Sequence, residues 1–190
     1  MKKGFTIIEV TILFVIFLIV AFLVAPLSVD DTIQAKNTSR WRSVQDDFTN
    51  IINTIYLQTD ENNVTFKKRF ETVIDEEFNS YAKPYNINYL NGNDAKNIVD
   101  NYRTTQQKAT FSYKIFDTPE NKLLGIILYD VNGTKKPNTL GKDIFGYNVY
   151  EDRFEPFCRK DNINKQKKDC SRNGTGLCCS NYYLIGGNFD

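Results

Sequence analysis

The sequence predicts an α+β fold in which an apolar and then an amphipathic N-terminal helical region precedes a small antiparallel β-sheet and a disulfide-bonded C-terminal region. Three observations predict this fold class: an apolar run at residues 5–29, apolar side chains at helical spacing over residues 41–55, and two strand-like segments within residues 108–131. With 190 residues, 41% of them apolar, the chain has room for one core and an appendage.

The apolar run, FTIIEVTILFVIFLIVAFLVAPLSV, carries Glu9 as its only charge. As a helix rising about 1.5 Å per residue it would exceed the roughly 30 Å hydrocarbon core of a bilayer, so we expect a membrane-spanning helix. Lys2 and Lys3 precede it, which favours a cytoplasmic N-terminus and an extracytoplasmic remainder. The run is too long for an ordinary secretory signal. A plain uncleaved membrane anchor leaves Glu9 unexplained, because an acidic side chain within a membrane-spanning helix costs free energy.

The stretch KKGFTIIEV resembles the N-terminal signature of type IV prepilins. The resemblance implies that a prepilin peptidase removes residues 1–4 by cutting between Gly4 and Phe5, and that Phe5 is then N-methylated. It also implies that Glu9 of one subunit neutralises the Phe5 amine of a neighbour during filament assembly. Pro26 lies where members of this family often have a proline, and it predicts a break near residues 23–27, whether as a bend or as the end of the membrane segment.

Residues 30–59 predict an amphipathic continuation of the helix. Its apolar stripe requires a sheet to cover it, and we interpret its single tryptophan as a packing residue rather than an interface anchor. In the pilin-like layout that the resemblance implies, residues 5–29 are the transmembrane and filament-core half of one long helix, and the second half packs on an antiparallel sheet. The stripe consists of Trp41, Val44, Phe48, Ile51, Ile52 and Ile55.

Residues 60–190 predict an extracytoplasmic globular α+β head. After a polar break at residues 60–63, residues 64–82 have helical spacing, and residues 94–102 suggest a further short helix. Residues 108–118 and 122–131 predict a β-hairpin, residues 144–149 another strand, and the closing YYLIGGNF a last strand.

The stretch DVNGTKKPNTLGKDIFGYNVYEDRF resembles a segment of many pilin-like and pseudopilin-like proteins. The oxygen-bearing side chains of Asp130, Asn132 and Asp143 make calcium a candidate cofactor here, although the spacing departs from an EF-hand loop. The alternative is a capped loop between strands that fixes the register of the sheet.

The cysteines Cys158, Cys170, Cys178 and Cys179 all lie in the tail, residues 156–190. They lack the C-x-x-C pairs of a zinc site and the sequence has no histidine, so disulfides are favoured. A bond between the adjacent Cys178 and Cys179 would be strained; we therefore expect Cys170 to pair with one of them and Cys158 with the other. Six basic residues between positions 158 and 172 predict a solvated loop or, alternatively, a DNA- or surface-binding patch.

No nucleophile constellation or phosphate-binding loop occurs in the sequence, and the absence of histidine removes the commonest general base, so we expect no enzyme activity and no required cofactor. The resemblance implies a minor pilin or pseudopilin of a type IV pilus or type II secretion filament in the bacterial inner membrane. Its implied partners are other pilin or pseudopilin subunits, prepilin peptidase/methyltransferase, an assembly platform and the membrane. The alternatives are a filament-displayed module for DNA uptake or adhesion and an unprocessed membrane-anchored domain.

Overall fold

A computed structural model of the protein describes residues 6–57, 65–78, 80–105, 108–120 and 122–188, without the side chains of residues 24–30, 46–47 and 117–120. The chain divides into two compact units, Met1–Lys36 and Asn37–Asp190. The described elements are α1 (Ile7–Leu57), α2 (Phe66–Glu77), β1 (Ser80–Tyr81), β2 (Asn101–Thr104), β3 (Thr110–Glu120), β4 (Leu123–Asp130), β5 (Ile144–Tyr150), β6 (Phe154–Pro156), α3 (Ile163–Asp169) and α4 (Cys179–Leu184).

The structure corrects the prediction that the first half of the N-terminal helix, residues 5–29, spans a membrane. Within the described part of the chain, no helix has the combined length and hydropathy needed to cross a membrane.

The predicted break at residues 23–27 does not end the helix, because α1 includes Pro26 and continues to Leu57. Proline has a backbone φ that a helix accepts, and its main cost is one missing N–H donor and local crowding. The other parts of the expected fold class, an α+β head with an antiparallel sheet and disulfides, are confirmed.

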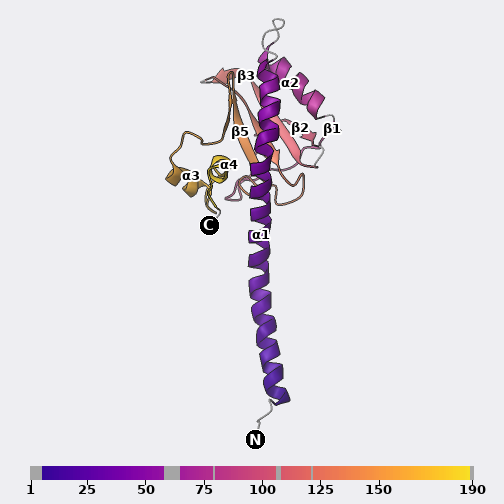
Figure 1. The fold of residues 1–190 in the computed structure, drawn as a ribbon, viewed down its shortest axis with the longest axis vertical. Coiled ribbons are helices and arrows are strands. Elements are labelled where there is room, and N and C mark those ends of the chain that lie inside the picture. The colour runs from indigo at the N-terminus through magenta and orange to yellow at the C-terminus, as the bar shows by residue number, and fades with distance from the viewer. Residues whose placement is uncertain (1–5, 58–64, 79, 106–107, 121, 189–190) are drawn as a thin grey trace. The chain divides into compact units, whose positions relative to one another are not determined.

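The sheet is a six-stranded antiparallel meander whose strands lie in chain order, β1 to β6 (Figure 1). The predicted hairpin is confirmed as β3 and β4, in which Tyr113 pairs with Ile127. The strand predicted at residues 144–149 is confirmed as β5, where Tyr147 pairs with the same Ile127. Alternate residues therefore align on one face across three neighbouring strands.

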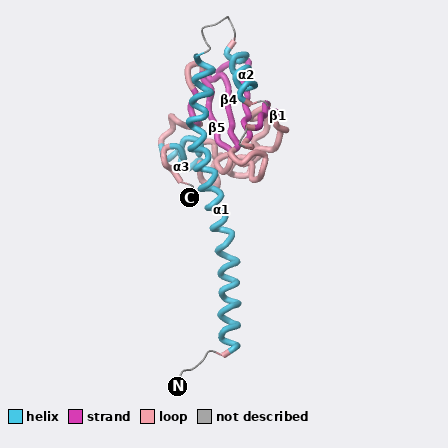
Figure 2. The backbone as a smooth tube through the Cα atoms, turned by 45° about the vertical axis from the view of Figure 1, so that its right-hand side comes forward, coloured by secondary structure: helices cyan, strands magenta, loops and turns pink. Residues whose placement is uncertain are grey.

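One face of the sheet is covered by α2 and by the second part of α1, residues 37–57, which lie side by side in Figure 2. Phe48 of α1 stacks near Phe111 and Tyr147, with ring centroids 5.7 and 5.2 Å apart, and Phe70 of α2 contacts Tyr113 edge-on at 5.1 Å. The predicted stripe is confirmed. Trp41, Phe48 and Ile55 are buried in this core, and Val44, Ile51 and Ile52 are partly buried and pack against it. The helix predicted at residues 64–82 is shorter than expected, because residues 80–81 form the edge strand β1.

The opposite face packs Leu128 and Ile144 against residues 87–99. The short helix predicted at residues 94–102 is wrong, since Asp94 forms an isolated β-bridge with Asn88, residues 96–98 form a turn, and β2 begins at Asn101. The buried Ala95 and Val99 are spaced as on a helix, but their contacts with the sheet determine the local backbone.

Candidate assembly site and disulfide-bonded region

The first turn of α1 is closed by reciprocal hydrogen bonds between Thr6 and Glu9. The backbone N and Oγ1 of Thr6 donate to Glu9 Oε2 at 2.8 and 3.0 Å, and Glu9 N donates to Thr6 Oγ1 at 3.3 Å. This arrangement is a capping box, in which an acid at the third helical position satisfies backbone donors that otherwise lack partners. Glu9 therefore has a local structural role in a single subunit, which the sequence reasoning missed although Thr-x-x-Glu is its usual signature.

The side chains of α1 from Ile7 to Leu23 are exposed and, apart from Glu9 and Thr11, apolar or small. Ile8, Phe14 and Phe17 are 71%, 61% and 67% exposed, respectively. Because successive residues are about 100° apart around a helix, this unbroken run presents apolar groups on every side. A helix that is apolar all round is stable only when other apolar groups cover it.

Three of the predicted N-terminal site residues are not described in full by the structure. Gly4 and Phe5, the expected cleavage and methylation positions, lie outside the described residues together with the whole leader at residues 1–4. Pro26 lies within α1, but its side chain belongs to the part that is not described. The pairing of Glu9 with a neighbouring Phe5 amine stays a prediction.

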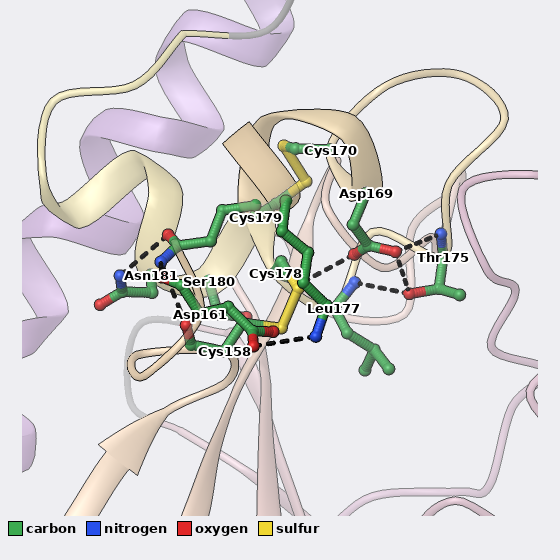
Figure 3. The surroundings of a disulfide bond; sticks show 12 residues. Cys158, Asp161, Asp169, Cys170, Thr175, Leu177, Cys178, Cys179, Ser180 and Asn181 are labelled. Carbon is green, nitrogen blue, oxygen red and sulfur yellow. Dashed lines mark hydrogen bonds and ion pairs between the residues drawn. A yellow bond between two sulfur atoms is a disulfide. The ribbon is translucent and has the colours of Figure 1, made fainter. Parts of the chain in front are cut away.

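The four cysteines form two disulfides in the predicted pattern. Cys158 bonds to Cys178, and Cys170 bonds to the adjacent Cys179 (Figure 3). Cys170 and Cys179 are buried in the main core, where Gly141 approaches closely with a positive φ of 83°; a Cβ on this glycine would meet the Cys179 sulfur. The disulfide-bonded tail is therefore part of the core rather than a loose appendage.

Asp169 fixes the loop between α3 and α4. Its Oδ1 accepts hydrogen bonds from Thr175 N and Oγ1 at 2.8 and 2.7 Å, and its Oδ2 accepts one from Cys178 N at 2.9 Å (Figure 3). A single carboxylate thus accepts three hydrogen bonds from the segment that places Cys178 and Cys179 next to their disulfide partners.

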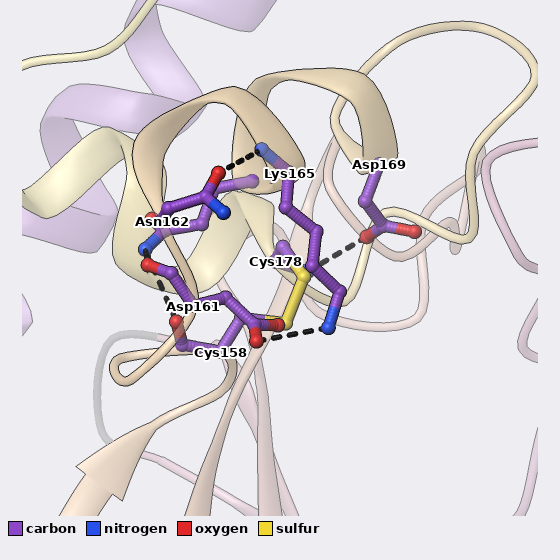
Figure 4. Close-up of polar contacts among 7 residues, drawn as sticks. Cys158, Asp161, Asn162, Lys165, Asp169 and Cys178 are labelled. Carbon is purple, nitrogen blue, oxygen red and sulfur yellow. Dashed lines mark hydrogen bonds and ion pairs between the residues drawn. A yellow bond between two sulfur atoms is a disulfide. The ribbon is translucent and has the colours of Figure 1, made fainter.

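The α3 helix is fixed to the rest of the tail by its cap and by one buried amide. Asn162 Oδ1 accepts from Lys165 N at 2.9 Å as an N-cap (Figure 4). The buried Gln166 donates through Nε2 to the carbonyl oxygens of Cys158 and Asp161 at 3.1 and 2.7 Å. Its Oε1 accepts from Asn181 Nδ2 at 2.9 Å, which links α3 to α4.

The last strand predicted for YYLIGGNF is wrong, because residues 179–184 form α4. Its Tyr182 and Tyr183 are buried in the main core. Aromatic residues favour strands, but the disulfide at Cys179 and the bond from Trp41 Nε1 to Ser180 O (2.9 Å) hold this segment against α1 as a helix.

One group of metal-type ligands lies close together in the described part of the chain, and it consists of Cys158, Asp161 and Cys178. Both sulfurs are committed to a disulfide and therefore offer no thiolate to a metal. Asp161 instead forms an ion pair with Lys165 at 2.9 Å (Figure 4).

The structure brings together the three residues predicted to hold calcium. Asn132 bridges the two acids: its backbone N donates to Asp130 Oδ1 at 3.1 Å, and its Nδ2 donates to Asp143 Oδ2 at 2.9 Å. Asp143 also accepts from Asn138 N at 2.9 Å and Thr139 N at 2.7 Å.

Both carboxyl groups of this loop are buried, and burial raises their pKa values. The pKa of Asp130 rises to about 8, first because of burial and second because of the nearby Asp143 charge. The pKa of Asp143 is also raised by burial, against the lowering effect of its hydrogen bonds to Thr139 and Asn138. Tyr85 OH donates to Asp130 Oδ2 at 2.9 Å; sequence reasoning missed this partner, which lies 45 residues earlier.

The carboxylate oxygens of this loop point at N–H and O–H donors, which would compete with a cation. Calcium prefers six to eight oxygen ligands, whereas each of these four carboxylate oxygens already accepts a hydrogen bond from protein. The arrangement fits the predicted alternative, a capped loop that sets sheet register, better than it fits calcium. Because Thr139 N and Asn138 N are backbone donors, they cannot turn away without moving the loop.

The basic residues predicted in the tail are exposed around α3. Two of them form ion pairs in the described structure, Lys165 with Asp161 and Lys160 with Glu155. The exposed set is Arg159, Lys160, Lys165, Lys167, Lys168 and Arg172.

Comparisons with known proteins return no matching family model, curated protein or solved structure. The N-terminal sequence, the exposed apolar helix and the disulfide-bonded head are therefore the features of this chain that bear on its function.

Proposed function

We propose that this protein is a structural subunit, a minor pilin or pseudopilin, of a type IV pilus or type II secretion filament. It is processed by prepilin peptidase and polymerises through the N-terminal part of α1. The observation that carries the proposal is the exposed, all-round apolar surface of residues 7–23, which includes Glu9 in the first turn of the helix. Helices of neighbouring copies packed around one another would remove that surface from water at about 25 cal/mol per Å².

Glu9 gives this assembly its register. In a bundle of apolar helices the carboxylate would be costly unless a cation lay beside it. Cleavage after Gly4 creates such a cation, the amine of Phe5, four residues before Glu9. One charge pair per subunit contact would then select the axial offset between neighbouring helices.

The head supports an extracytoplasmic location for the mature subunit. Two disulfides and no free cysteine occur in the described part of the chain, and such bonds persist in oxidising compartments. In the filament the head forms the outer layer, and an assembly platform in the inner membrane adds the subunits.

The first test is intact-mass measurement with N-terminal sequencing of the protein from the cells that produce it. We expect loss of MKKG and one added methyl group on Phe5. A functional protein that still begins with Met1 would contradict the proposal and favour an unprocessed domain.

The second test separates the charge of Glu9 from its capping role. Glu9→Gln keeps an acceptor for Thr6 N, since glutamine also serves in capping boxes, but removes the charge. We expect normal processing and a strong loss of filament incorporation in Glu9→Gln, similar to Glu9→Ala. The control Glu151→Gln changes an exposed acid of the head and should assemble normally. Normal incorporation of Glu9→Gln would refute charge docking.

A second candidate function is a filament-displayed module for DNA uptake or adhesion, which the exposed basic residues of the tail favour. If they bind DNA, retention on DNA falls steeply as salt rises and falls again in Lys167→Glu or Lys168→Glu. Retention that is insensitive to both changes excludes this role for the basic residues.

A further inference from the structure

A groove lies between the second part of α1 and the C-terminal end of α2. Its volume is about 360 Å³. The buried side chains of Phe48, Val73 and Phe78 form part of its floor, whereas the exposed Glu76 and Glu77 lie at its rim. The groove therefore combines an apolar floor with an acidic edge.

A complementary surface lies on α3. Ile163, its first residue, is 56% exposed and is the one large apolar side chain of this otherwise polar helix. Lys167 and Lys168 occupy the last turn of the same helix. Because residues four positions apart lie on neighbouring parts of a helix surface, Ile163 and Lys167 can meet one partner together.

The two surfaces lie at opposite ends of the strand order and cannot contact each other within one copy. α2 packs beside β2 and β3, as shown by the 2.7 Å ion pair of Asp75 with Arg103 of β2 and by the ring contact of Phe70 with Tyr113 of β3. The tail packs beside β5, where Gly146 N donates to Ser180 Oγ at 2.8 Å. In Figure 1, α2 lies at the right, near β1 and β2, and α3 lies at the left, beyond β5.

We propose that α3 of one copy docks into the α1–α2 groove of a second copy, with Ile163 on the apolar floor and Lys167 facing the acidic rim. The contact joins two different surfaces, so repeating it adds copies in one direction and produces an open chain or a ring rather than a closed dimer. It uses head residues alone, and thus goes beyond assembly through the N-terminal helix.

Photo-crosslinking of the full-length protein in the cells that produce it tests the contact. With p-benzoylphenylalanine replacing Ile163, light should join two copies, and mass spectrometry should place the link within residues 44–54 or 73–78. The control, the same probe replacing Ile185, occupies a similarly exposed position (54%) and should not give this link. Links from position 163 to other residues, to DNA or to another protein would overturn the proposal, as would no link between copies.

Charge reversal provides an independent readout. In the position-163 background, Lys167→Glu or Glu77→Lys should lower the crosslink yield by roughly twofold to fivefold, the effect expected for exposed charges, and the two together should restore it. Lys135→Glu, an exposed lysine in another loop, serves as the control. An unchanged yield, or no rescue in the double variant, would count against the docking. Because these readouts leave Glu9 and Phe5 intact, their failure is distinct from a failure of N-terminal processing.

Discussion

The indole Nε1 of Trp41 donates a 2.9 Å hydrogen bond to the carbonyl oxygen of Ser180, and both residues are fully buried. The bond connects α1 with α4 across 139 residues of sequence. Trp41 also stacks on Phe145 of β5 at 5.1 Å. One side chain thereby joins the N-terminal helix, the sheet and the disulfide-bonded tail.

Trp41→Phe keeps an aromatic ring against Phe145 but removes the hydrogen bond to Ser180. We expect a loss of about 1–2 kcal/mol in the free energy of unfolding, from the missing bond and the smaller ring. Trp41→Ala should lose about 3–5 kcal/mol, since it also leaves a cavity. Urea denaturation of the two variants measures both values, and equal stability of Trp41→Phe and the original protein would show that the bond contributes nothing.

The buried Asp130 predicts that stability depends on pH. Its pKa is about 8 in the folded protein and near 3.8 when unfolded, so the folded state binds more protons between these values. The stabilisation of the folded state that comes from this raised pKa is therefore fully present below about pH 4 and is lost as the pH rises towards 8. We expect the free energy of unfolding to fall by roughly 2–4 kcal/mol between pH 5 and pH 8.

The comparison that tests this pH dependence is Asp130→Asn, which removes the titrating group at nearly constant shape. Its stability should fall much less over the same pH range. The exposed-site control Glu151→Gln should retain the slope of the original protein. A slope that survives in Asp130→Asn would assign the pH dependence to other groups, first of all Asp143, whose pKa is also raised by burial.

The same loop gives a calcium prediction. Since backbone donors of Asn138 and Thr139 point at Asp143, we expect the unfolding midpoint at pH 8 to be the same in excess calcium and in chelator. A bound ion would stabilise the folded state by RT ln(1 + [Ca²⁺]/Kd). A midpoint that rises with calcium in the original protein but not in Asp143→Asn would therefore establish a calcium site.

Local sequence patterns predicted the elements in which pattern and packing agree. Helical spacing predicted the stripe from Trp41 to Ile55, which packs against the sheet, and aromatic and β-branched content predicted β3, β4 and β5, which contribute to the same core. The disulfide pattern also followed from local reasoning, because adjacent Cys178 and Cys179 left few pairings.

Sequence reasoning failed where contacts distant along the chain decide the backbone. Residues 179–184 have strand composition but form a helix that contacts Trp41. In the candidate calcium loop, Asp130, Asn132 and Asp143 could be found from their spacing, whereas Tyr85 could not, because it reaches Asp130 only through the folding of residues 85–99 over the sheet. The local capping box of Thr6 and Glu9 was detectable in the sequence as Thr-x-x-Glu. The apolar residues around Glu9 instead led to the prediction of a charge partner in another copy.

The two disulfides should contribute differently to the stability of the tail. Chain entropy alone predicts about 3 kcal/mol for the Cys158–Cys178 bond and about 2.5 kcal/mol for Cys170–Cys179, whose sequence separations are 20 and 9. Both Cys170 and Cys179 are buried in the main core, so replacing them with alanine also removes packed sulfur atoms. We therefore expect the Cys170→Ala/Cys179→Ala double variant to be the less stable one, despite its shorter loop. Urea denaturation of both double variants under non-reducing conditions gives the comparison, and the original protein in reductant is the reference for loss of both bonds. If the Cys158→Ala/Cys178→Ala variant loses more free energy of unfolding, loop closure outweighs core packing in this tail.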